Sequence, residues 1–434
     1  MTFPPARSTA LSRRRLLGAL GAGSLAPALS GCRERTESGI TLRMVSTNHG
    51  ERMREPFAAA LREFEREHPG VRVRETTMDD DVYQKMGLVN LFVGGDPPDL
   101  FFQWGGELVR KYADAGHALD LTPFLPPEER ERFLPSCWAS CRASGGYYLW
   151  PTSASVTTVL WYRRSLFERA VQPPTTWEEL IAVCESFRQS GTIPIAVGNK
   201  ELWSGGNFAA WIAAQRLGAE RYRQVLGLAP GTRLDDPELV DAFRLLSDLQ
   251  ARGFFNRGVA GVSTDEARSL LAQGRAAMHP IGDWLVSEVE PEEAEDLDAI
   301  LLPPLPNQSG ETGTLLALAT GYMVARRSRH PELAVALLRH LTRTEVQRGW
   351  TEHGHVSSLR AAAPGPEAPV GQRRLTEFME TAPAAALAPD VGFNLEVSDA
   401  FLDAVSLVLA GRAAPETALA DAERQVRALR RAAA

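Results

Sequence analysis

The first part of the chain alternates between short apolar runs and amphipathic segments with helical spacing. Strands are predicted where apolar residues are consecutive or alternate, over residues 41–45, 71–73 and 99–102. Helices are predicted between them, from residue 54 to a stop signal at 68–70 and over residues 84–92. This order of strand, helix, strand, helix and strand is typical of a parallel sheet with right-handed crossovers.

A second series of elements begins at residue 147. Strands are predicted over residues 147–151, 157–162, 193–197 and 276–279. Thr176 and Glu179 have the spacing of a capping box, which predicts that a helix begins there. Further helices are predicted over residues 208–217, 265–273, 332–347, 398–410 and 415–432, with proline-rich connections at 303–306 and 361–369. Two α/β lobes, between which the chain crosses several times, are the most economical architecture for this order.

The N-terminal segment has the features of an export signal. Residues 1–31 contain four arginines and no acidic residue, and a short apolar stretch follows the arginine cluster. The cluster resembles a twin-arginine signal, and the sequence Leu-Ser-Gly-Cys that ends at Cys32 resembles the bacterial lipobox. We therefore predict a lipoprotein export signal over residues 1–31, lipidation of Cys32 and a polar tether over residues 32–39. The alternative is a plain secretory signal followed by an incidental cysteine.

Composition and charge narrow the class of protein. The chain has 434 residues, of which 44% are hydrophobic and 23% are charged, and this excludes a disordered or a polytopic membrane protein. Removal of residues 1–31 takes four of the 47 basic residues, which leaves 43 against 54 acidic residues and a net charge of −11. Such an acidic balance argues against a nucleic-acid-binding surface spread over the molecule.

The cysteines and histidines indicate neither a disulfide framework nor a metal site. If Cys32 carries lipid, an odd number of cysteines remains, and these cannot all pair within one chain: Cys137, Cys141 and Cys184. No further cysteine or histidine cluster lies near them at zinc-finger spacing. His353 and His355 are two residues apart, a spacing that does not place two imidazoles on one helical face. No metal, cofactor or catalytic residue is therefore predicted.

Six segments, in their order along the chain, carry a resemblance to a known family. They are residues 64–73, 94–100, 113–123, 161–167 together with 173–180, 274–278, and 282–284. This order resembles the extracellular solute-binding proteins of ABC importers, and in particular the carbohydrate-binding, maltose-binding-protein-like group (family 1). The resemblance covers almost the whole chain after the export signal. It departs from the group at Arg163, where an asparagine is usual.

The resemblance implies an α/β protein with the two-lobe, type II periplasmic-binding-protein fold, in which hinge-linked lobes close on a ligand in the cleft between them. Hinges are then expected near residues 153–158, 314–321 and 365–372. Lobe one would comprise residues 40–153 and 321–365, and lobe two residues 158–314 and 372–434. Only a ligand that contacts both lobes stabilises the closed form.

A carbohydrate site needs flat aromatic side chains for the apolar face of the sugar and polar side chains for its hydroxyls. In lobe one, the polar segment after the first strand offers His49 and Glu51, and the end of the third strand offers Gln103 and Trp104. The competing interpretation is structural. The first segment would cap the next helix, and Trp104 would be a packed residue at the rim.

Lobe two offers further candidates. Trp203 is predicted in a glycine-rich loop, and Asp283 and Trp284 follow the strand over residues 276–279. An aspartate that accepts two hydroxyl hydrogen bonds beside an indole suits a pyranose, whereas the competing interpretation is that Asp283 caps a helix that begins at Trp284. His355, in the turn after the helix over residues 332–347, is a further candidate. Two other tryptophans flank the first hinge and are predicted to be core residues, Trp150 and Trp161.

The sequence therefore predicts a membrane-anchored, substrate-binding lipoprotein of a carbohydrate ABC importer. A monomer on the periplasmic or outer surface would deliver its sugar to the permease and ATPase, with no chemistry of its own and no nucleic-acid partner. The alternatives that stay open are a non-sugar ligand (a polyol, polyamine, metal chelate or peptide) and a sensing or scaffolding role. An exported hydrolase is the last alternative, although the sequence has no Gly-x-Ser-x-Gly elbow, phosphate-binding loop or His-Glu-x-x-His helix.

Overall fold

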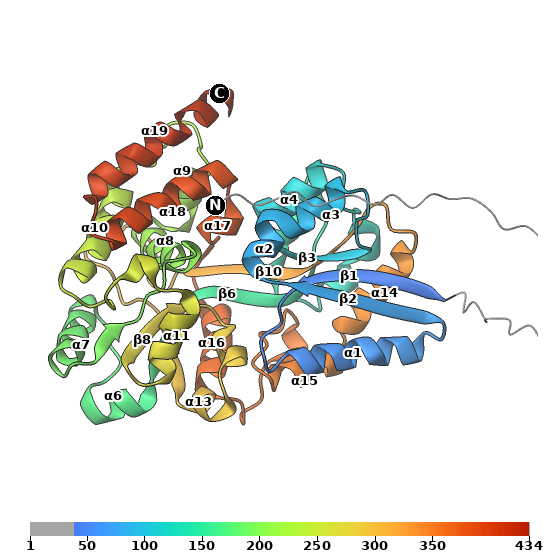
Figure 1. Cartoon of the computed structure of the whole chain (residues 1–434), viewed down its shortest axis with the longest axis horizontal. Coiled ribbons are helices and arrows are strands. Elements are labelled where there is room, and N and C mark those ends of the chain that lie inside the picture. Colours follow the sequence, from blue (N-terminus) through green and yellow to red (C-terminus); the bar gives the residue numbers. More distant parts are fainter. Residues whose placement is uncertain (1–38, 434) are drawn as a thin grey trace, which may run out of the picture. The chain divides into compact units, whose positions relative to one another are not determined.

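The computed structural model describes residues 39–433 (Figure 1). The predicted export signal, the lipidation site Cys32 and most of the predicted tether lie outside the described residues. Within the described part of the chain, no helix combines the length and the apolar character that crossing a membrane requires.

One sheet organises the molecule, and its first three strands are the predicted ones. β1 (Ile40–Thr47) pairs in parallel with β2 (Val71–Met78) and with β3 (Leu100–Trp104). The crossover from β1 to β2 contains α1 (Arg54–Glu67), which buries one apolar face. The parallel arrangement predicted from the alternating elements is therefore confirmed for this part of the chain.

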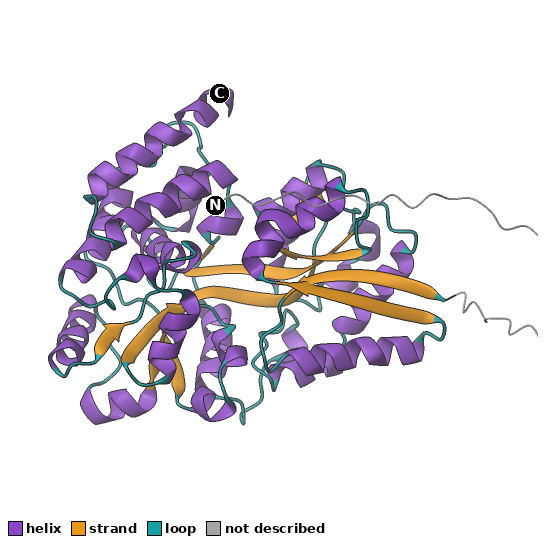
Figure 2. Ribbon diagram, viewed as in Figure 1, coloured by secondary structure: helices purple, strands orange, loops and turns teal. Residues whose placement is uncertain are grey.

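Two long strands extend the sheet from its first part to its second (Figures 1 and 2). β6 (Trp150–Arg163) pairs antiparallel along its first half with β10 (Leu315–Val324), which in turn pairs with β3. The second half of β6 pairs with β8 (Ala276–Ile281) and β9 (Leu297–Ile300). β7 (Ile193–Ile195) and β11 (Ala385–Ala386) pair with β8 and β10, respectively.

The prediction of two separate strands at residues 147–151 and 157–162 is wrong, because β6 is continuous from Trp150 to Arg163. The segment between the two predicted strands is polar, and this interrupts the apolar pattern on which the prediction rested. Its backbone continues the pairing with β10, and its side chains find partners: Ser155, for example, donates a hydrogen bond to Asp283.

The remaining elements of the first half of the chain, many of them short, surround the sheet. They are α2 (Asp80–Val82), the π-helical turn η1 (Tyr83–Gly87), α3 (Leu88–Val93), α4 (Glu107–Asp114), η2 (Thr122–Phe124), α5 (Pro127–Arg130), η3 (Pro135–Cys141), β4 (Arg142–Ala143), β5 (Gly146–Tyr147), α6 (Arg164–Ala170), α7 (Trp177–Gln189) and α8 (Trp203–Leu217). The predicted capping box at the start of α7 is confirmed, since Thr176 and Glu179 exchange both hydrogen bonds.

The second half is dominated by helices. They are α9 (Ala219–Leu226), α10 (Pro237–Ala251), η4 (Val259–Gly261), α11 (Thr264–Ala272), α12 (Leu285–Glu288), α13 (Pro291–Glu295), α14 (Pro331–Leu341), α15 (Thr344–Thr351), η5 (Arg360–Ala362), α16 (Val370–Thr381), α17 (Pro389–Gly392), α18 (Leu395–Leu409) and α19 (Pro415–Ala433). The single helix predicted over residues 332–347 is wrong, because the chain leaves the helix at Thr342. The hydroxyl of Thr342 bonds back to the carbonyl of Leu338 and accepts a hydrogen bond from the indole of Trp150.

The core confirms the prediction for the two tryptophans of β6. Trp150 and Trp161 are both fully buried, the first among residues of β1, α1 and α14 and the second among residues of β8, α12 and α16. Three cysteines are buried as free thiols: Cys137, Cys141 and Cys184. Burial raises the pKa of the Cys137 and Cys184 thiols to about 12, so both stay protonated and unreactive at neutral pH.

Candidate functional site

The middle of β6 is the segment on which several candidate side chains converge. It is a buried strand rich in serine and threonine, and its polar groups bond to residues from distant parts of the chain. Ser155 donates a hydrogen bond to Asp283 at 2.6 Å. The backbone carbonyl of Thr152 lies 2.9 Å from Nε2 of His355, so that nitrogen carries the proton and donates it.

Asp283 follows the end of β8 and is held there by the backbone, since its N–H donates to the carbonyl of Val156 in β6. Only 6% of the residue is exposed, and this burial raises the pKa of its carboxyl group to about 7 against the opposing effect of the Ser155 hydrogen bond. The competing interpretation, in which Asp283 caps the next helix, is wrong: the N-cap of α12 is Trp284, and the helix has no side-chain cap.

Asp283 is followed in the sequence by Trp284, whose indole ring contacts that of Trp203 in α8. The ring centroids of Trp203 and Trp284 are 5.8 Å apart, and their planes are inclined by 58°. Both side chains are only partly buried. The strand-to-helix turn needs a glycine next to them, because a Cβ on Gly282 would lie 2.0 Å from the ring of Trp284.

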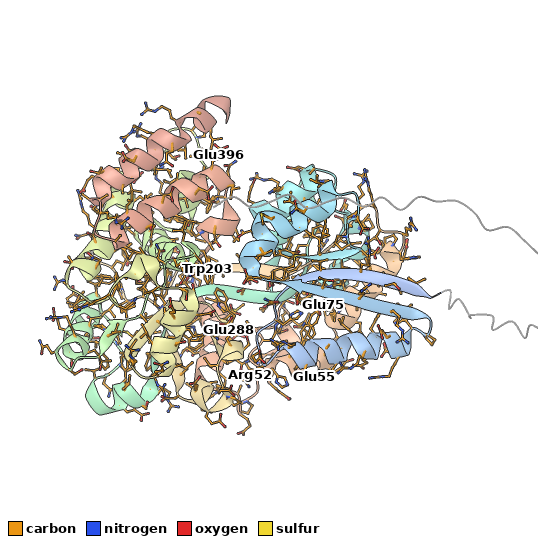
Figure 3. The ribbon with its side chains drawn as sticks, viewed as in Figure 1. Arg52, Glu55, Glu75, Trp203, Glu288 and Glu396 are labelled. Carbon is orange, nitrogen blue, oxygen red and sulfur yellow. The ribbon has the colours of Figure 1, made fainter. Side chains whose placement is uncertain are left out.

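The prediction that Trp203 lies in a loop is wrong, because Trp203 is the first residue of α8 (Figure 3). Its neighbours in the sequence are small and polar, a composition typical of loops. The helix forms nevertheless because its small residues permit close packing: a Cβ on Gly206, for instance, would lie 2.0 Å from the side chain of Leu402 in α18. We call Trp203, Asp283 and Trp284 the indole–carboxyl group.

The lobe-one candidates after β1 lie in different environments. His49 Nε2 is 2.8 Å from a carboxylate oxygen of Glu75 in β2, and its ring stacks on Phe57 with centroids 4.0 Å apart. The side chain of Glu51 is 72% exposed and forms an ion pair with Arg54 at 2.8 Å. His49 is therefore held in a packed polar contact, whereas Glu51 lies at the surface.

Gln103 and Trp104 end β3, next to β10. Gln103 is 3% exposed and lies opposite Gly321 in the sheet, and its side-chain oxygen has no hydrogen-bond partner. The ring of Trp104 meets Phe102 and Tyr83 edge to face, with centroids 5.0 and 6.0 Å apart. Gln103 thus has an unused acceptor, and Trp104 is held rigidly by its aromatic neighbours.

His355 lies at the end of an aromatic series that leads back to His49. Phe57 stacks on Trp350 at 5.3 Å, and Trp350 meets His355 edge to face at the same distance. Burial, together with the charge of His49, lowers the pKa of His355 to about 4 and outweighs its hydrogen bond to Thr152. His355 is therefore a neutral side chain at neutral pH.

Arg52 ties the loop after β1 to two other segments. Its guanidinium donates to the carbonyl of Val286 in α12 at 3.0 Å and to the carbonyl of Glu352 at 3.1 Å, and its backbone N–H donates to Ser287. Gly354 makes this junction possible, because it has a φ of +92° and a Cβ there would lie 2.8 Å from the backbone nitrogen of Ser287. Figure 3 shows Arg52 close to the segment that carries Glu288.

The structure adds buried polar atoms that the sequence analysis did not single out. In α8, Ser204 and Asn207 are each 3% exposed, and Oγ of the first and Oδ1 of the second have no hydrogen-bond partner. In α17, which packs against both α8 and α4, Oδ1 of Asp390 is buried without a partner, and burial raises the pKa of this carboxyl to about 7. A signal existed for Asn207, an amide in an apolar helix. Asp390 stands in an alanine- and proline-rich stretch that gave none.

The structure therefore brings some candidates together and leaves others apart. Trp203 contacts Trp284, the residue after Asp283, and Asp283 itself bonds to Ser155 of β6. His49 and His355 belong to one aromatic series. Gln103 and Trp104 lie at the end of β3, and Glu51 is separate and exposed. A surface cavity of about 440 Å³ touches none of them, since it is lined by residues 171–173, Thr175, Glu179 and residues 182–183. Among residues 39–433, no three His, Cys, Asp or Glu side chains are grouped to hold a metal ion.

Comparisons with known proteins place this geometry among solute-binding proteins. The model of the family described as bacterial extracellular solute-binding protein matches residues 46–348. An uncharacterised ABC transporter extracellular-binding protein of Pyrococcus horikoshii is 25% identical over 319 residues, which cover 72% of this chain and 71% of the relative.

Two solved structures have the same fold. A chitin oligosaccharide binding protein superposes with a TM-score of 0.81 at 22% identity, covering 90% of this chain and 99% of that protein. A bacterial solute receptor with an exclusive preference for β-D-galactopyranose superposes with a TM-score of 0.82 at 17% identity, again covering 90% and 99%. The two-lobe, type II fold predicted from the sequence is confirmed by these superpositions.

Proposed function

The chain belongs to the bacterial extracellular solute-binding proteins, and we propose that it is the component of an ABC importer that captures a carbohydrate and presents it to the permease. The observation that carries the proposal is the indole–carboxyl group: two partly exposed indoles in mutual contact, one of them on the residue that follows the buried Asp283. Indole faces suit the C–H face of a pyranose, and a carboxyl accepts its hydroxyl hydrogen bonds. The sugar-binding proteins with the same fold support this choice of ligand.

Capture would work by closure of the two lobes about hinges near residues 153–158, 314–321 and 365–372. β6 and β10 run through the first two of these segments, which makes them suitable bending elements. On the proposed boundaries, residues 40–153 and 321–365 form lobe one, and residues 158–314 and 372–434 form lobe two. Arg52 of lobe one would then bond to Val286 of lobe two only in the closed form.

Ligand contacts would come from both lobes. Lobe two would supply the indole–carboxyl group, and lobe one would supply Gln103 and Trp104, with Gln103 offering its unused side-chain oxygen. His49 and His355 would line the floor of the cleft as hydrogen-bonding groups, and Glu51 would contact only a ligand that reaches the surface. A ligand that touches both lobes stabilises the closed form by its differential contacts.

The protein would perform no chemistry and would need neither metal nor cofactor. It would act as a monomer that delivers the closed, loaded lobes to the transmembrane subunits and their ATPase. Export would use the signal over residues 1–31, and lipid on Cys32 would anchor the protein to the membrane, facing the periplasm or the outer surface.

The experiment that tests the proposal is a thermal-shift screen of residues 39–434 with mono- and oligosaccharides, because a ligand bound only to the native state raises the melting temperature. Calorimetry then tests the site: Asp283→Ala and Trp284→Ala should each weaken binding by about 1–3 kcal/mol, since a polar ligand loses a partner in a desolvated place. Asp248→Ala, which removes only a surface ion pair with Arg252, is the matched control. Unchanged affinity in both site variants would refute the site, and the absence of any saccharide that shifts the melting temperature would refute the function.

A further inference from the structure

The loop that follows β10 carries three exposed arginines. We call residues 326–330 the arginine loop, after Arg326, Arg327 and Arg329. Within residues 39–433 the guanidinium groups of these three side chains form neither an ion pair nor a hydrogen bond. Residues 326–332 contain the three arginines and one acidic residue, Glu332, so their net charge is +2, whereas the chain after the export signal has a net charge of −11. A positive segment on an acidic protein suits an anionic partner.

Asp99 fixes the arginine loop beside the first strand. Its backbone N–H donates to the carbonyl of Arg43 in β1 at 2.8 Å, and its carbonyl accepts a hydrogen bond from the N–H of Ala325 at 2.9 Å. Its carboxylate accepts a hydrogen bond from the hydroxyl of Ser328 at 2.7 Å. Arg43 lies three residues, or about 10 Å along a strand, after Ile40, the first residue of β1. The arginine loop therefore lies where the chain enters β1, and Figure 1 shows α14, which follows the loop, on the same side of the molecule as the start of β1.

An exposed apolar side chain lies at the same end of the sheet. Val93, the last residue of α3, is 82% exposed, more than any other large hydrophobic residue in the described part of the chain. Three residues later, the carboxylate of Asp96 pairs with Arg43 of β1 at 2.6 Å. The ring of Phe92 lies 4.7 Å from that of His117, whose carbonyl accepts a hydrogen bond from the first N–H of the arginine loop. These contacts place the turn that carries Val93 next to both β1 and the arginine loop.

The proposed lipid anchor would bring a membrane close to this end. Residues 33–39 separate Cys32 from the start of β1, and seven residues span about 25 Å at full extension. The start of β1 and the loops around it are therefore the part of the protein that the anchor would hold nearest to the lipid headgroups.

The chemistry of this end suits an anionic membrane surface. Guanidinium groups form paired hydrogen bonds with phosphate oxygens, and each basic residue near an anionic surface increases binding about fivefold. An exposed apolar side chain beside them can enter the boundary between headgroups and acyl chains. Unpaired arginines and an exposed valine thus supply the two contributions that bind a protein to such a surface.

We propose that the arginine loop and Val93 form a docking surface for anionic phospholipids, which holds the proposed lobe one against the membrane. The proposal rests on the proposed lipid anchor and goes beyond it, because a flexible tether alone leaves the orientation of the protein free. Docking here leaves the candidate sugar site uncovered. Ser155, the partner of Asp283, pairs with Leu318 of β10, which lies six residues, or about 20 Å along the strand, before Val324 at the end next to the arginine loop.

The test measures binding of residues 39–434 to lipid vesicles by co-sedimentation. These residues form one compact unit, and they lack the lipid, so binding reports the docking surface alone. One set of vesicles is pure phosphatidylcholine, and the other contains equal parts of phosphatidylcholine and phosphatidylglycerol. The protein should bind only the anionic vesicles, and the partition coefficient should fall as sodium chloride is added, because salt screens the attraction.

Variants assign the binding to the arginine loop. Replacing all three of its arginines with glutamine should lower the partition coefficient on anionic vesicles about 30–100-fold, and each single replacement about 3–5-fold. The matched control is Arg257→Gln with Arg412→Gln, two exposed arginines outside the loop, and it should stay within about twofold of the wild type. The melting temperature, measured with and without a saccharide that binds, checks that each variant folds.

A second pair of variants tests the apolar contribution. Val93→Ser should lower the partition coefficient about 3–10-fold, because the valine leaves water on docking. Leu395→Ser is the control, since Leu395 is also well exposed but belongs to α18. An effect of Leu395→Ser as large as that of Val93→Ser would exclude a specific role for Val93.

The outcomes separate the docking surface from the proposals around it. No binding to anionic vesicles, equal binding to neutral vesicles, or wild-type binding by the triple arginine variant would each overturn it, and sugar capture would still stand on its own thermal-shift test. Displacement by millimolar inorganic phosphate at constant ionic strength would assign the arginines to free phosphate and also overturn it. Mass spectrometry of the protein extracted from membranes tests the anchor separately. An unmodified Cys32 together with arginine-dependent vesicle binding would refute the anchor and support the docking surface.

Discussion

Replacing Asp283 with asparagine removes an ionisable group from the interior and keeps the oxygen that accepts the hydrogen bond from Ser155. In the folded protein the pKa of this carboxyl is about 7, against an ordinary value of 3.8. Between these two values the unfolded chain loses the proton while the folded chain retains it, so folding becomes less favourable as the pH rises. The loss is about 1.4 kcal/mol per pH unit and reaches about 4 kcal/mol above pH 7.

The asparagine variant lacks this loss. We therefore compare the free energy of unfolding of Asp283→Asn with that of the wild type. The difference should not change with pH below about pH 4, should rise in favour of the variant between about pH 4 and pH 7, and should then level off. Urea unfolding of the ligand-free protein across this range measures the difference, because the two proteins differ only in this one side chain. Asp248→Asn should show no such rise, since its aspartate is half exposed and paired with Arg252. Parallel stability curves for Asp283→Asn and the wild type would refute the reasoning.

Three further predictions concern the surroundings of the site. Arg52→Ala removes the two guanidinium hydrogen bonds to the carbonyls of Val286 and Glu352 and leaves the proposed ligand contacts in place. It should weaken ligand binding about 3–10-fold and shift the small-angle scattering towards that of the open form. Wild-type affinity in calorimetry would exclude a role of Arg52 in closure. Gly282→Ala places a methyl group against the Trp284 ring and should lower the free energy of unfolding, measured with urea, by about 1–3 kcal/mol. Gly261→Ala is the control in the same measurement, because a methyl group at Gly261 meets open space. His355 has a pKa of about 4 in the folded protein against an ordinary value of 6.5, so its contribution to the free energy of unfolding is complete above pH 6.5 and is lost as the pH falls towards 4. His355→Gln should therefore make the free energy of unfolding depend less on pH in that interval. An unchanged pH dependence between pH 4 and 6.5 would contradict the burial of the imidazole.

Local signals along the chain were sufficient for elements whose pattern is set by one buried face. β1, β2 and β3 and the helix α1 followed from apolar spacing, and the capping box at Thr176 followed from its residue types. Local signals failed where a long-range partner decides the structure. Thr342 ends α14 because its hydroxyl also serves Trp150, which lies 192 positions away in the sequence.

The candidate site shows the same division. Asp283 and Trp284 could be selected from the sequence because their residue types match the chemistry of a sugar. Their relation to Trp203 could not, because Trp203 lies 81 positions earlier than Trp284 and its small neighbours suggested a loop. Asp390 had no local signal at all, since a single aspartate in an alanine- and proline-rich stretch reads as a surface residue.

The sequence by itself determined the residue types, the periodicity of the main elements and the family resemblance, because these depend on neighbours a few positions apart. Only the tertiary structure decided which polar side chains lose water and which of them find a partner. That distinction sets the properties of individual side chains: Asp283 and Asp390 are ordinary aspartates in the sequence, and burial without a counter-charge raises the pKa of each carboxyl to about 7.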